Sequence, residues 1–153
     1  MFLYLVQHGD AKREEEDPSR PLSDKGVEDV KKIASFLLRL KITVEEVLHS
    51  SKLRARQTAE ILAKSLSVTK GISETEGLAP LNDPDVWAAK LKTKTHSLIL
   101  VGHLPHLQKL SSFLLSGDKG KSIIAFKMGG VVCMRRDDAE TWTLQWMITP
   151  EIV

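Results

Sequence analysis

The sequence predicts an α/β fold with a largely parallel sheet and helices on both of its faces. Three observations lead to this prediction. Short apolar runs suited to buried strands alternate with helical patterns over the first two-thirds of the chain. Two of the runs, residues 2–6 and 97–101, contain no charge, as expected for strands covered on both faces. No repeat, linker or low-complexity segment interrupts the 153 residues, so we expect a single domain over 1–153.

Helical periodicity is found in four stretches, where apolar residues recur at i, i+3 and i+4 spacing. Ser23 is a good N-cap for the first stretch, and Ser50 and Ser51 are expected to cap the second. A proline stands in the first turn of each of the other two. In chain order, helices are expected over 24–40, about 52–66, 84 to about 92 and about 105–116.

The strands are expected where short apolar or alternating runs are bounded by turn residues. In chain order they are 2–6, 44–49, a short strand within 69–77, 97–101, 122–127, 130–135 and 141–147. The last two are expected to form an antiparallel hairpin, because only a short turn separates them.

Composition excludes several classes of function. A formal net charge of +2 is too small to indicate binding to nucleic acid or to an anionic membrane. No apolar run approaches the roughly 18 residues that span a bilayer. The first residues do not form a signal peptide, so we expect a cytoplasmic protein. The single cysteine, Cys133, lies in an apolar run and is expected to be a buried thiol. The sequence does not determine the oligomeric state.

Two of the apolar strands end in a glycine–histidine pair, at His8-Gly9 and at Gly102-His103. Parallel strands present their carboxyl ends at one edge of a sheet, so both histidines can meet there. Arg54 falls in the first turn of the second helix, where it adds to the positive end of the helix dipole. Two histidines, an arginine and a helix N-terminus together predict a phosphate pocket. On residues 2–10 alone, a polar turn with an incidental histidine is an equal alternative.

A metal site is the competing use of two histidines. It would need a third ligand, for which Asp10 and Glu76 are available. No HxH or HxxxH spacing exists, and a positive Arg54 beside a cation is unfavourable, so we expect neither metal nor cofactor. The remaining histidines are expected in the core or on the surface, with His106 an alternative at the pocket rim; they are His49, His96 and His106.

Four motifs in order resemble the histidine phosphatase superfamily, and most closely its small SixA-type branch. They are Gln-His-Gly-Asp-Ala, Arg-Pro-Leu-Ser-x-x-Gly, Ser-x-x-Leu-Arg-Ala-x-Gln-Thr-Ala and Val-Gly-His-Leu-Pro, and they fall within about 1–115. The resemblance implies a three-layer, phosphoglycerate mutase-like α/β sandwich. It also implies a phosphatase that needs no metal and acts on phosphohistidine in a partner protein.

The resemblance also assigns roles to individual residues. His8 would accept the phosphoryl group covalently, and Arg54 and His103 would bind its oxygens. Other residues would contact the substrate or serve as general acid. The substrate-binding set is Gln7, Gly9, Arg20 and Ser50, and the candidate acids are Asp10 and Glu76.

Gln7 departs from the family pattern, which has arginine before the histidine. Glutamine keeps amide donors but loses the charge, which could cost about ten- to a hundredfold in rate if nothing compensates. Arg20 is the expected substitute, ahead of Lys12 and Arg13. The departure keeps open a second function, a non-catalytic module that binds a phosphorylated ligand. A third is a mutase or small-metabolite phosphatase, which the short stretch at 77–96 disfavours.

Overall fold

The computed structural model describes residues 1–153 and contains eight strands and four helices. The strands are β1 (Phe2–Gln7), β2 (Thr43–Val44), β3 (Glu46–His49), β4 (Ser67–Val68), β5 (Ile72–Glu74), β6 (Leu98–Gly102), β7 (Val131–Arg136) and β8 (Trp142–Ile148). Six of them form one sheet in the order β5-β3-β6-β1-β7-β8, while β2 and β4 form a separate parallel pair. The expected strand at 44–49 is therefore divided between two sheets.

The sheet is largely parallel, as the sequence predicts. Strands β5, β3, β6 and β1 run in one direction, and β7 pairs antiparallel with both β1 and β8. The predicted hairpin at the end of the chain is confirmed. Gln7 lies opposite Gly102, and His49 lies opposite Val101, so three strands end at the same edge of the sheet.

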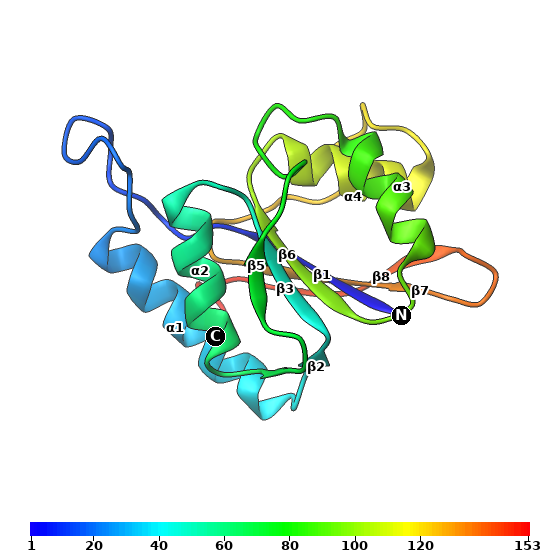
Figure 1. The fold of residues 1–153 in the computed structure, drawn as a ribbon, viewed down its shortest axis with the longest axis horizontal. Helices are drawn as coiled ribbons and strands as arrows, with labels where there is room; N and C mark the ends of the chain where they lie inside the picture. Colours follow the sequence, from blue (N-terminus) through cyan, green and yellow to red (C-terminus); the bar gives the residue numbers. More distant parts are fainter.

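The four helices cover both faces of this sheet, which confirms the three-layer arrangement (Figure 1). They are α1 (Asp24–Arg39), α2 (Leu53–Ala63), α3 (Pro84–Thr93) and α4 (His106–Ser116). Helices α1 and α2 lie on one face, α3 and α4 on the other. Side chains of β1 alternate between the two cores: Tyr4 and Val6 pack with α1 and α2, Leu3 and Leu5 with α3 and α4.

Helix α2 begins differently from the prediction. Its N-cap is Lys52, which makes no side-chain capping bond, and the helix ends at Ala63 rather than near residue 66. Ser50 is not the N-cap: its hydroxyl lies 2.6 Å from His103 Nε2 and accepts only a long bond of 3.4 Å from the Lys52 amide. Ser23 does cap α1, since its side chain accepts a hydrogen bond from the Gly26 amide.

The predicted strand at 122–127 is wrong. Ile124 and Phe126 are buried in the core beneath α3 and α4, whereas Ile123 is 46% exposed, and this alternation produced the strand pattern. The segment packs against the α3–α4 core rather than along a free edge of the sheet, and no strand pairs with it. Side chains of α4 bond to the backbone of this region: Gln108 donates to the Ile124 carbonyl, and Ser112 donates to the Lys121 carbonyl.

None of the helices is both long enough and apolar enough to cross a membrane, the longest being α1 with 16 residues.

Candidate active site

The two histidines predicted to meet do so at the carboxyl edge of the sheet. His8 follows β1 and His103 follows β6, and their ring centroids lie 4.9 Å apart at an angle of 52°. The His8 amide donates to the Gly102 carbonyl at 3.0 Å, which extends the β1–β6 pairing into the site. Both side chains are buried. The sheet itself therefore fixes the separation of the two imidazoles.

The His8 ring is held in one tautomer. Its Nδ1 lies 2.7 Å from the Gly9 carbonyl oxygen. Because a carbonyl oxygen only accepts, Nδ1 carries the hydrogen and Nε2 carries a lone pair when the ring is neutral. Burial lowers the pKa of His8 to about 4, with further lowering by the charges of Arg54 and Arg20 and partial opposition from the Gly9 bond. His8 is therefore neutral at pH 7 with its Nε2 available.

Gly9 is locked against two helices. Its amide donates to Thr58 Oγ1 at 3.0 Å, and Thr58 in turn donates to the Arg54 carbonyl at 2.8 Å. A Cβ atom at Gly9 would lie 2.8 Å from a methyl of Val30, so a side chain does not fit without movement. Sequence reasoning missed Thr58; the available signal was a polar residue on the apolar side of α2, one turn after Arg54.

Two arginines supply positive charge beside His8. Arg54 lies in the first turn of α2, and its Nε donates toward His8 Nε2 at 3.4 Å. Burial, followed by the charge of Arg20, lowers the pKa of Arg54. Arg20 Nε donates to the Lys12 carbonyl at 3.1 Å, and Arg20 has a left-handed φ of 46°. Such strained residues occur often at functional sites. Two neighbouring guanidinium groups favour an anion between them.

His103 is held by Ser50. The Ser50 hydroxyl lies 2.6 Å from His103 Nε2, while Nδ1 of His103 is buried without a hydrogen-bond partner. Burial, followed by the charges of His8, Arg54 and Lys52, lowers the pKa of His103 to about 3. His103 is thus neutral at pH 7 and can donate only through whichever ring nitrogen carries its hydrogen.

Gln7 contributes no charge to this region. Its backbone carbonyl accepts a hydrogen bond from the Gly129 amide, which also donates to the His8 carbonyl. The side-chain oxygen Oε1 of Gln7 is buried and makes no hydrogen bond. An arginine at this position would have added a third guanidinium group. With Gln7 in its place, the charges that lower the pKa of His8 are those of Arg54 and Arg20.

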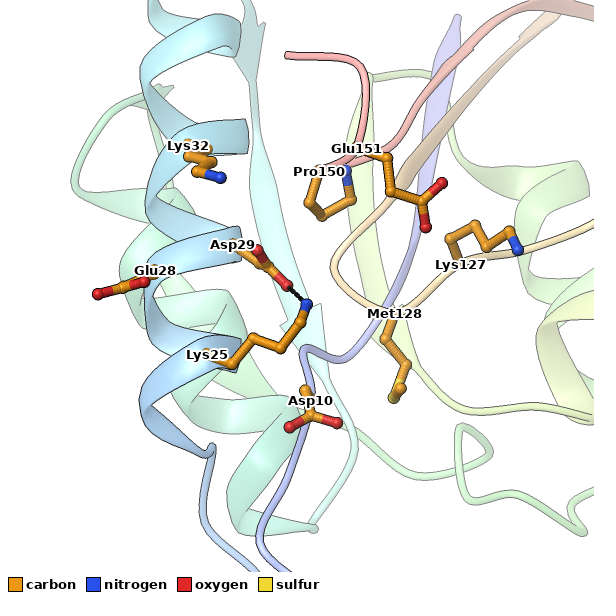
Figure 2. Close-up of a pocket in the computed structure, with 9 residues that line it drawn as sticks. All are labelled: Asp10, Lys25, Glu28, Asp29, Lys32, Lys127, Met128, Pro150 and Glu151. Atoms are coloured by element: carbon orange, nitrogen blue, oxygen red, sulfur yellow. Dashed lines mark hydrogen bonds and ion pairs between the residues drawn. The ribbon is translucent and has the colours of Figure 1, made fainter.

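The two candidate acids lie on different sides of the site. Asp10 accepts a hydrogen bond from Ser23 and lines a cavity of about 590 Å³ between α1 and the residues after β8 (Figure 2). In that cavity Lys25 reaches along α1 to pair with Asp29. Glu76 lines a second cavity of about 600 Å³, which includes Ser50. Neither carboxylate hydrogen-bonds either active-site histidine.

The remaining histidines are outside the cluster. His106 is fully buried in the first turn of α4, after the cis Leu104–Pro105 peptide, and neither ring nitrogen has a partner. Burial lowers its pKa to about 4, which the charge of Asp83 partly opposes. His49 Nδ1 donates to the Ser50 carbonyl at 2.9 Å, and His96 is exposed. No group of three or more histidine, cysteine, aspartate or glutamate side chains is arranged to hold a metal ion.

Comparison with known proteins identifies the family. Residues 3–82 match the family model of the histidine phosphatase superfamily, branch 1. The chain belongs to this superfamily. It is 27% identical over 155 residues to the phosphohistidine phosphatase SixA of Escherichia coli, covering 98% of this chain and 94% of SixA. An uncharacterised protein of Picosynechococcus is 34% identical over 142 residues, covering 88% of this chain and 85% of that one.

The fold comparison agrees with the family. The solved structure of the protein histidine phosphatase SixA complexed with tungstate superimposes with a TM-score of 0.87 at 27% identity, covering 98% of this chain and 97% of that chain. This chain is therefore of the SixA type and has a phosphoglycerate mutase-like fold. The homology supports a phosphatase.

Proposed function

We propose that this SixA-type protein is a phosphohistidine phosphatase that transfers the phosphoryl group from a histidine of another protein to His8 and then to water. The observation that carries the proposal is the state of His8. Its Nδ1 hydrogen is bound to the Gly9 carbonyl, its pKa is about 4, and Arg54 lies beside its Nε2. A neutral imidazole with one free lone pair is a competent nucleophile at pH 7.

The first step is attack of His8 Nε2 on phosphorus. A new N–P bond forms as the bond from phosphorus to the substrate histidine breaks, and the departing imidazole takes up a proton. The transferred group carries its negative charge on three oxygens, so positioning and charge are the main needs of this reaction. Arg54 and Arg20 meet these needs, and one such donor is worth about 100- to 1,000-fold in rate in comparable sites.

In the second step, water attacks phospho-His8 and inorganic phosphate leaves, which restores neutral His8. His103 donates a hydrogen bond to a phosphoryl oxygen in both steps, with Ser50 fixing its ring. The negative phosphoryl group stabilises a proton on His103 and opposes the charges that lower its pKa in the free protein. Chemistry at His8 through these residues needs neither a metal nor a cofactor.

The proton for the leaving imidazole has two candidate sources. Glu76 is the better one, because it lines the cavity that includes Ser50 and therefore adjoins the His103 side of the site. Asp10 is the weaker candidate, because Ser23 occupies its carboxylate. The imidazole of phosphohistidine is a good leaving group once it is protonated, so this acid contributes less than the two arginines.

Relatives support the substrate class. The homologous SixA is a phosphohistidine phosphatase, and its matching structure holds tungstate, a tetrahedral oxyanion of the shape of phosphate. A phosphorylated histidine side chain on a protein surface is therefore the substrate that we propose for this chain.

The test is hydrolysis of a protein carrying phosphohistidine by the wild-type protein and by His8→Ala, together with detection of labelled phosphoenzyme after an alkaline denaturing quench. We expect turnover and an acid-labile phosphohistidine in the wild type only. Equal rates for the two proteins would refute the proposal.

Gln7 supports one alternative, a module that binds phosphorylated ligands without turnover. It predicts vanadate or phosphate binding with no phosphoenzyme at any time after mixing. A small-metabolite phosphatase would instead hydrolyse phosphate monoesters of sugars or serine faster than phosphohistidine in a protein.

A further inference from the structure

The cavity that includes Ser50 is next to the proposed phosphoryl site. It has a volume of about 600 Å³, and the Ser50 hydroxyl on its wall is 2.6 Å from His103 Nε2. We propose that it binds the segment of the substrate protein that flanks the phosphohistidine, and that Glu74 selects a lysine or arginine in that segment. This inference rests on the function proposed above and names the class of phosphoprotein.

Two unpaired carboxylates give the cavity its charge. Glu74 and Glu76 are both exposed on its wall, and neither takes part in a salt bridge. Lys90 also lines the cavity, but its ammonium group lies over the ring of Trp87, 4.9 Å from the centroid. A basic side chain entering the cavity would therefore meet Glu74, whose carboxylate is free to pair.

The rim of the cavity is suited to contact with a protein. Val86 on the cavity wall is 45% exposed, and Leu81, which precedes the lining residue Asn82 in the loop between β5 and α3, is 89% exposed but does not line the cavity itself. Exposed apolar side chains beside a polar site are typical of protein-binding surfaces. A polypeptide next to the phosphohistidine can cover Val86 and extend over this loop.

The cavity is formed before any substrate binds. The Thr75 amide donates to the His49 carbonyl at 2.9 Å, and Trp87 donates to the Glu76 carbonyl at 3.1 Å. Asn82 accepts from the Ala79 amide at 2.8 Å. These bonds tie the loop to β3 and α3, so little ordering is needed when a partner binds.

The same charges act against small polyanions. A metabolite with a second phosphate or a carboxylate beside the transferred group would place that charge near Glu74 and Glu76. Repulsion there reduces binding, which favours a protein substrate over such metabolites.

The experiment compares two peptides that carry a stable phosphonate analogue of phosphohistidine, one flanked by lysines and one by glutamates. We expect the wild-type protein to bind the lysine peptide at least about fivefold more tightly, the size of one to two exposed charge pairs. Glu74→Lys should abolish or reverse this preference. Asp138→Lys makes the same charge change in the β7–β8 turn, at the opposite edge of the sheet, and should leave it intact.

Raising the salt concentration should weaken the preference in the wild type, because exposed charges are screened. Equal dissociation constants for the two peptides, or a preference that survives Glu74→Lys, would overturn the inference. Hydrolysis of the matching phosphohistidine peptides separates it from the proposed function. Hydrolysis without preference would support the proposed function and refute the subsite. Selective binding of the analogues without hydrolysis would support the subsite and refute the proposed function.

Discussion

The carboxyl edge of the sheet and the first turn of α4 both bury neutral histidines, but they hold them differently. Gly9 fixes the His8 ring and Ser50 contacts His103, while both nitrogens of His106 have no partner. Burial is the main cause of the lowered pKa at all three. A lowered histidine pKa therefore does not by itself mark a reactive group in this protein. A fixed ring with an arginine beside it does so better.

The largest expected effect comes from removing Arg54, the arginine that lies beside His8 and has no counterpart at His106. Arg54→Gln should lower kcat with a phosphohistidine protein by about 100- to 1,000-fold, because it removes a charged donor next to the transferred group. Steady-state kinetics measures this loss. A change below threefold would show that Arg54 does not contact the phosphoryl group. An adjacent arginine would then no longer separate the reactive His8 from the buried His106.

The second prediction concerns the charge that Gln7 lacks. Arg20→Gln should reduce kcat/KM by about ten- to a hundredfold, since one charged hydrogen bond is worth roughly 1.5–3 kcal/mol. Gln7→Arg should give little gain in the wild type but should recover most of the loss in the Arg20→Gln background. Independent effects of the two substitutions would exclude compensation of Gln7 by Arg20.

The third prediction tests how His103 is held. Ser50→Ala should lower kcat by about tenfold, the value of one hydrogen bond that orients the ring. Ser50→Thr keeps the hydroxyl and should restore part of the rate. A purely structural role would leave kcat unchanged in the folded variant and would lower only the thermal midpoint.

The smallest effect on activity is expected at His106. His106→Leu should change kcat by less than about twofold, because the ring bonds to nothing in the site. Its effect should appear in the pH dependence of stability. An unfolded histidine titrates near 6.5 and His106 near 4, so between these values the unfolded chain binds a proton that the folded chain does not.

Folding stability contributed by neutral His106 is thus complete above about pH 6.5 and is lost as the pH falls to about 4. The full loss is at most about 3.5 kcal/mol, at roughly 1.4 kcal/mol per pH unit. Urea titrations from pH 4 to pH 7.5 should show a shallower pH dependence in His106→Leu than in the wild type. An equal dependence in both proteins would show that His106 titrates normally.

The strand ends and the first turn of α2 could be predicted from sequence because each signal is local. A run of apolar residues stopped by His8-Gly9 or Gly102-His103 defines a buried strand and the position of its last side chain. The position of Arg54 in the first turn of its helix could be predicted from helical periodicity alone. The sheet then brings these residues together at one edge, as parallel pairing requires.

Features that depend on distant partners could not be predicted in this way. The alternation of Ile124 and Phe126 is that of a half-buried strand, but pairing depends on whether a neighbouring edge is free. Serine commonly caps helices, and Ser50 stands just before one, yet its hydroxyl contacts a histidine 53 residues away. Asp10 lies two residues after His8, and only the position of Ser23 shows where its carboxylate points.

The position of β1 in the sheet has a consequence for the order of assembly. This first strand lies between β6 and β7, whose residues 98–102 and 131–136 are synthesised long after it. During synthesis β1 has neither neighbour, so His8 cannot take up its final place until most of the chain has left the ribosome. Such distant pairings slow folding. Hydrogen exchange during refolding should therefore show the Gly129 amide, which bonds to Gln7 and His8, among the last to become protected.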